Sequence, residues 1–60
     1  MMNVMTGKNA VIELKNSKKY FGRVIEVIDA GDGLIFITIL KKDGMHECFP
    51  IDEVLRVEEI

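Results

Sequence analysis

Apolar and polar residues alternate most clearly near the start of the chain. In residues 8–15, Ala10, Ile12 and Leu14 fall on one side of an extended chain, and mostly polar residues fall on the other. Successive side chains of a strand point to opposite faces, so this pattern predicts a β-strand with one buried face. Helical spacing does not fit it.

Two longer apolar runs follow. Residues 19–29 carry apolar side chains on both faces and contain Gly22, which inside a strand often marks a bulge or a sharp bend. Residues 34–41 are almost wholly apolar and rich in β-branched side chains, which favours a strand buried on both sides over a helix. The three phenylalanines lie on separate runs and are predicted to be core residues: Phe21, Phe36 and Phe49.

Two short runs complete the pattern, residues 45–49 and 54–59, with Pro50 starting one helical turn between them. Short turn signals rich in Gly, Asn and Asp separate the earlier runs. These features predict an all-β domain over residues 1–60, a small, strongly bent, five-stranded antiparallel barrel. Closure would remove exposed sheet edges. Residues 1–6 are predicted to be a flexible or short helical N-terminus.

The length makes an additional source of stability necessary. A chain of 60 residues buries only about 60% of its unfolded surface, so its core is marginal. Cys48 is the only cysteine, which excludes a disulfide within the chain. Hydrophobic residues make up 48% of the sequence and the mean hydropathy is +0.17. This apolar surplus predicts self-association, so the chain itself is its first expected partner.

Net charge and targeting signals limit the expected ligands and the expected cellular location. The net charge is −2 and the isoelectric point is near 5.2, which argues against non-specific binding to nucleic acid or to anionic lipid. No apolar run approaches the length of a membrane span, and no signal peptide is evident. The expected location is cytoplasmic, with no membrane partner.

Two segments resemble a known family. Residues 11–24, VIELKNSKKYFGRV, are similar to the first motif of Sm-like (LSm) proteins, an apolar strand ending in Leu-Lys, a tight turn, and then Gly in an alternating strand. Residues 54–57, VLRV, are similar to the second motif, in which an apolar residue precedes Arg-Gly. The resemblance implies a barrel of the Sm/SH3-like type, a ring assembly and RNA as a candidate ligand.

The chain departs from this family at several positions. The loop at residues 29–33 lacks the Asn of members that bind uridine-rich RNA, and Ser17 and Val57 replace glycines of the two motifs. Only Arg56 matches the family's RNA pocket directly, and Asp29 matches it if one residue is inserted.

Charges are unevenly divided among the turns. In an up-and-down barrel, the first and third connections would form a basic end, and the second and fourth an acidic end with Asp29, Asp32, Asp52 and Glu53. Phosphates would be repelled from the acidic end, where the family's pocket lies. Solvation alone also explains charged turns. The candidate nucleic-acid-binding residues are Lys15, Lys18, Lys19, Tyr20, Lys41, Lys42 and Arg56, with Tyr20 or Phe21 as the stacking group.

No constellation of residues indicates catalysis. His46 and Cys48 share a strand face, but two ligands are too few for a structural metal site, and no carboxylate on that face would orient them as a base and nucleophile. The Gly31-Asp32-Gly33 sequence lacks the strand–loop–helix context of a phosphate loop. We therefore expect no enzyme activity, no cofactor and no metal.

The sequence thus predicts a non-enzymatic, self-associating Sm-like module that acts on RNA or on a protein partner. Copies would join by strand addition between the fourth strand and the fifth. The expected oligomer interface consists of Phe49, Val54, Leu55 and Val57. The alternative is a monomeric or dimeric SH3-like protein-interaction domain with no nucleic-acid role.

Overall fold

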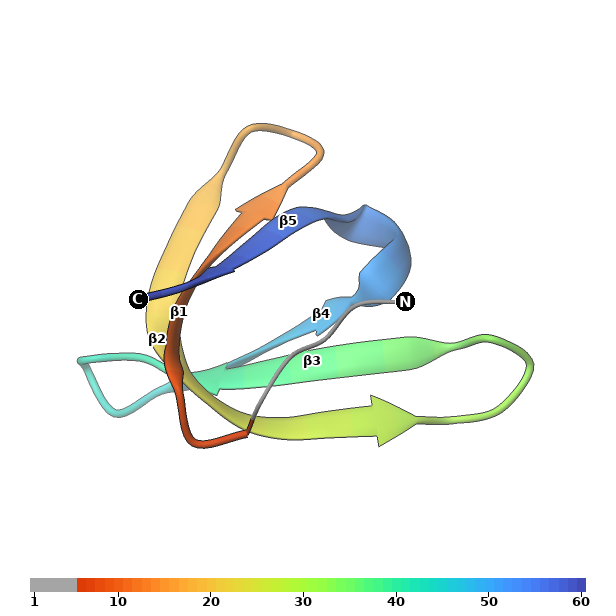
Figure 1. Ribbon diagram of the computed structural model, residues 1–60, viewed down its shortest axis with the longest axis horizontal. Helices are drawn as coiled ribbons and strands as arrows, with labels where there is room; N and C mark the ends of the chain where they lie inside the picture. The colour runs from red at the N-terminus through yellow and green to blue at the C-terminus, as the bar shows by residue number, and fades with distance from the viewer. Residues whose placement is uncertain (1–5) are drawn as a thin grey trace.

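The computed structural model describes residues 6–60, which form five strands and one 3-10 turn (Figure 1). The elements are β1 (Asn9–Leu14), β2 (Lys19–Asp29), β3 (Ile35–Leu40), β4 (His46–Pro50), η1 (Ile51–Glu53) and β5 (Val54–Glu59). The predicted strands and the short turn before the last of them are confirmed. Of the N-terminal segment expected at residues 1–6, only Thr6 is described, in a turn with Gly7, and the rest lies outside the described residues.

The strands form a single antiparallel sheet in the order β4-β3-β2-β1-β5. This confirms the all-β class and the antiparallel pairing. Strands β4 and β5 are the two edges, and no pairing between them is found within residues 6–60. The sheet is therefore open, and the expected closure into a barrel is not confirmed.

Strand β2 bends and joins the two halves of the sheet (Figure 1). Its first half, up to Arg23, pairs with β1, and its second half, from Arg23 onward, pairs with β3. A Cβ atom on Gly22 would lie 2.7 Å from the carbonyl oxygen of Leu40, so the backbones of β2 and β3 approach closely there. The register with β3 then shifts between Val24 and Glu26. The irregularity predicted around Gly22 is thus confirmed.

The core lies between the two halves of the bent sheet. Its buried apolar residues are Ala10, Ile12, Leu14, Val24, Ile37, Ile39, Phe49 and Val54. The inward face predicted for β1 is confirmed. Of the run expected to be buried on both sides, only residues 37–39 are buried. Leu34 lies before the strand and is 47% exposed.

One core prediction is wrong. Phe49 is buried and Phe36 is half-buried, but Phe21 is 44% exposed. Gly22 and Val24 take the inward positions of β2, so the alternation turns Phe21 and Arg23 outward.

The predicted separation into a basic and an acidic end is also wrong. Strand β5 runs antiparallel to β1, with Leu14 opposite Val54. The backbone N–H of Lys15 donates to the carbonyl oxygen of Glu53 at 3.0 Å. The basic first turn therefore lies beside the acidic η1 turn, because a strongly bent sheet does not keep alternate connections at opposite ends.

Candidate functional site

Three of the predicted nucleic-acid-binding residues surround the turn between β1 and β2. Lys15, Lys18 and Lys19 are exposed to solvent. The turn is held by a hydrogen bond from the backbone N–H of Lys18 to Asn16 Oδ1, 3.0 Å, and Ser17 adopts the left-handed conformation with φ 74°. These lysines are displayed on a tight hairpin whose neighbour is the acidic η1 turn.

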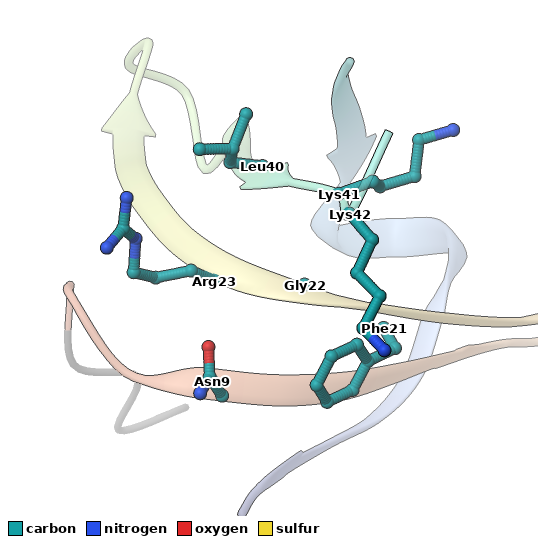
Figure 2. A pocket seen from close by; sticks show the side chains of 7 residues that line it. All are labelled: Asn9, Phe21, Gly22, Arg23, Leu40, Lys41 and Lys42. Carbon is teal, nitrogen blue, oxygen red and sulfur yellow. The ribbon is translucent and has the colours of Figure 1, made fainter. Parts of the chain in front are cut away.

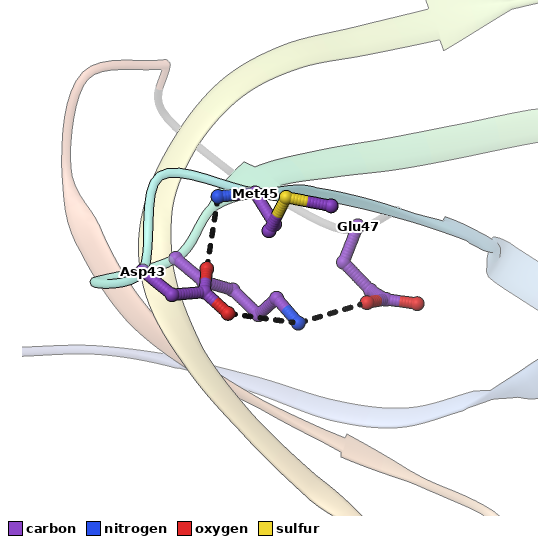
Figure 3. A network of polar contacts seen from close by, with 4 residues as sticks. Asp43, Met45 and Glu47 are labelled. Atoms are coloured by element: carbon purple, nitrogen blue, oxygen red, sulfur yellow. Dashed lines mark hydrogen bonds and ion pairs between the residues drawn. The ribbon is translucent and has the colours of Figure 1, made fainter.

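Lys41 is tied to acidic neighbours. Its Nζ lies 3.1 Å from Glu47 Oε1 and 4.0 Å from Asp43 Oδ2 (Figure 3). The hydrogen bond with Glu47, helped by the charge of Asp43 and opposed by desolvation, raises the pKa of Lys41 above its ordinary value of 10.5. Asp43 Oδ1 also accepts from the backbone N–H of Met45 at 2.8 Å. The charge of Lys41 therefore serves mainly to fix the β3–β4 turn.

Two further predicted ligand-binding residues are engaged within the chain. Arg56 Nη2 donates to Glu13 Oε1 at 2.9 Å, across the β1–β5 pair. The ring of Tyr20 packs against that of Phe49, with centroids 4.9 Å apart and planes tilted by 49°. Tyr20 thus belongs to the edge of the core, and its ring already packs against a protein side chain.

A shallow pocket lies on the outer side of the sheet (Figure 2). Its volume is about 360 Å³, and it is lined by Asn9, Phe21, Gly22, Arg23, Leu40, Lys41 and Lys42. The register brings these residues together, because Arg23 is opposite both Asn9 and Leu40. The predicted residues Lys41 and Lys42 line this pocket, whereas Lys15, Lys18 and Lys19 do not.

The pocket combines positive charge with an exposed aromatic ring. Arg23 and Lys42 make no ion pair with any residue of the described chain. Figure 2 shows the Lys42 side chain extending toward the Phe21 ring. The sequence interpretation did not include Arg23 among the binding residues, and it named Phe21 both as a core residue and as one of two candidate stacking groups. The alternation of Phe21, Gly22 and Arg23 was the available signal, because it sets an aromatic and a basic side chain on one face.

The residues expected at the oligomer interface differ in accessibility. Phe49 and Val54 are buried in the chain's own core, and Val57 is half-buried against that core. Leu55 on β5 is 61% exposed. Of these four residues, Leu55 offers the most surface to another molecule.

Other apolar side chains are also exposed. Met45 precedes β4 and Ile60 follows β5, and they are 61% and 75% exposed. A second group lies at the β2–β3 hairpin and consists of Val27, Ile28 and Leu34. Exposed apolar surface therefore gathers beside both sheet edges and on one hairpin.

The described residues hold no group of three His, Cys, Asp or Glu side chains arranged to bind a metal ion. His46 and Cys48 are exposed on β4. Across residues 6–60, no helix has the length and apolar character needed to cross a membrane.

Comparisons with known proteins add no assignment. No protein-family model matches the chain, and no curated protein or solved structure matches it either.

Proposed function

We propose that this chain is a non-enzymatic, cytoplasmic Sm-like module that self-associates by strand addition and has RNA as its ligand. The observation that carries the proposal is the open sheet, whose edge strands β4 and β5 each have a neighbour on one side only within residues 6–60. The lone, exposed Cys48 fits a reducing compartment, where it would stay a thiol.

An open edge favours association because its outward backbone groups can pair with another chain. Pairing β4 of one copy with β5 of the next satisfies both edges with a single kind of contact. Such a head-to-tail contact closes into a ring when the rotation between copies permits. A bent sheet of this size suits that arrangement, because a neighbouring copy would complete an Sm/SH3-like barrel by pairing with its open edge.

Burial at such an interface would come only partly from the residues that the sequence suggests. Phe49 and Val54 are already covered, so they support the edge strands from inside. Leu55, Met45 and Ile60 are the exposed apolar side chains beside the edges. Covering them would remove apolar surface worth about 25 cal/mol per Å², which a core as small as this one needs.

The runner-up is a monomeric or dimeric SH3-like domain that binds a protein. The apolar group on the β2–β3 hairpin favours it, because Val27, Ile28 and Leu34 lie away from the β4 and β5 edges and are each at least 40% exposed. An interface there would use side chains alone and would not need the open edges.

Matched charge substitutions separate the two proposals. Leu55→Asp places a charge beside the β5 edge and should lower the native mass to that of a monomer. Leu34→Asp makes the same chemical change on the hairpin and should leave the mass of the assembly unchanged. Light scattering on a sizing column measures both, and circular dichroism checks that the exposed substitutions leave the fold intact.

The reverse result, with Leu34→Asp lowering the mass and Leu55→Asp leaving it unchanged, would replace edge pairing by a hairpin contact.

A further inference from the structure

We propose that the pocket between β1, β2 and the β3–β4 turn binds single-stranded RNA, with a base stacked on Phe21 and phosphates held by Arg23 and Lys42. This inference rests on the proposed RNA role and names the surface that serves it. It does not require the assembly, because the pocket residues belong to β1, β2 and β3 and to the turn after β3.

Phe21 gives the pocket a stacking surface. It is 44% exposed, although the other two phenylalanines are buried or half-buried. Nucleic-acid bases stack on such rings whatever their sequence, because every base has a π-face. Tyr20 is less suited to this role, since its ring packs on Phe49.

The charged side chains that line the pocket are all basic. Arg23 and Lys42 line the pocket and have no carboxylate partner in the described chain. Lys19 lies two residues before Phe21 on the same face of β2, outside the pocket lining, and its cross-strand neighbour on β1 is Glu13. The Asn9 amide adds a group that can donate and accept hydrogen bonds. This surface is complementary to a ligand that has both negative charges and aromatic rings.

The sheet topology favours a nucleic acid over an acidic peptide. Strands β1, β2 and β3 each have neighbours on both sides, so no open backbone edge borders the pocket. A peptide could not add as a strand there, which is a common way for a sheet to hold an extended chain. A ligand must be recognised by side chains alone, and stacking together with phosphate contacts meets that condition.

The positions that match the Sm-like RNA pocket are occupied by contacts within the chain. Arg56 is bound to Glu13, and Asp29 Oδ1 accepts from the backbone N–H of Gly31 at 2.9 Å. The proposed surface lies instead on the outer side of the sheet. Gly22 and Leu40, whose backbones approach closely, both line it.

The test is fluorescence anisotropy with labelled ten-nucleotide oligouridine and oligoadenosine at several salt concentrations. Phe21→Leu, which keeps an apolar side chain, should weaken binding about 5-fold or more through lost stacking. Arg23→Gln and Lys42→Gln should each weaken binding and lower the slope of log affinity against log salt by about 0.7. Lys18→Gln on the β1–β2 turn is the matched control and should change affinity least.

Four outcomes would overturn the inference. Unchanged affinity in Phe21→Leu would remove stacking, and loss of binding only in a Lys15→Glu, Lys18→Glu double variant would move the RNA to the first turn while leaving the RNA role intact. Equal affinity for a ten-residue oligoglutamate, with the same dependence on Phe21, would identify an acidic peptide. If the unsubstituted protein bound neither oligonucleotide, the RNA role itself would fail, and native mass would test the assembly separately.

Discussion

Gly22 and Ser17 show how single residues shape this chain in opposite ways. Gly22 lies where β2 passes from one partner strand to the other, and any side chain there would meet the Leu40 backbone. Ser17 has φ 74°, a left-handed conformation that glycine adopts without the steric cost of a Cβ atom. One position therefore needs the absence of a side chain, and the other tolerates one at a cost.

Substituting these two residues should change stability in opposite directions. Gly22→Ala should lower the free energy of unfolding by about 1–3 kcal/mol, because the new methyl group would collide with backbone atoms. Ser17→Gly should be neutral or should raise it by up to about 1 kcal/mol, because relief of the left-handed strain is partly offset by greater entropy of the unfolded chain. Urea unfolding at one protein concentration measures both. Equal or greater stability of Gly22→Ala would contradict the close approach of β2 to β3.

For single residues, the sequence predicted where the backbone bends better than which side chains are exposed to solvent. Gly22 predicted the bend because glycine within a strand weakens it and usually marks a bulge, a bend or a close backbone approach. The sequence left Phe21 as both a core residue and a candidate stacking group, because aromatic residues are usually buried and only the alternation with Gly22 and Val24 decides its face. Arg23 was not chosen as a binding residue because its position beside Phe21 depends on the same alternation.

The strands and turns were largely predictable, since their signals are local. Alternation and turn residues located all five strands, and Pro50 located the η1 turn. The direction of β5 against β1 was not predictable, because it depends on how sharply the whole sheet bends. For that reason the expected basic and acidic ends were wrong, as Lys15 and Glu53 are hydrogen-bonded neighbours.

The turn between β3 and β4 allows a test of pH dependence. The pKa of Lys41 is raised mainly by its hydrogen bond with Glu47. A raised lysine pKa in the folded state contributes stability that is complete below the unfolded value and is lost as pH rises through the folded value. Glu47→Gln should therefore be less stable than the unsubstituted protein at pH 8, and the difference should shrink at pH above the ordinary lysine value of 10.5.

Urea midpoints from pH 8 to pH 11.5 measure this difference. Glu26→Gln, an exposed carboxylate on β2, is the control and should run parallel to the unsubstituted protein. A Glu47→Gln difference that stayed constant or widened with pH would contradict the contribution assigned to Lys41.

Residues 6–60 form a bent, open sheet with a small core, and within them β4 and β5 are the edge strands. Closure into a barrel was expected from the sequence because it removes edges, but β4 and β5 remain unpaired with one another in residues 6–60. The amino-acid pattern could not decide between closure within a chain and closure between chains, since both bury the same strands. The proposed self-association would pair the edges and add buried surface to the marginal core.

Native mass across a dilution series, by light scattering on a sizing column, tests this central claim most directly. The proposal predicts one stable species of about five to seven chains, a closed ring that persists on dilution. A monomer at all concentrations would contradict self-association and leave the SH3-like protein-interaction domain as the better description.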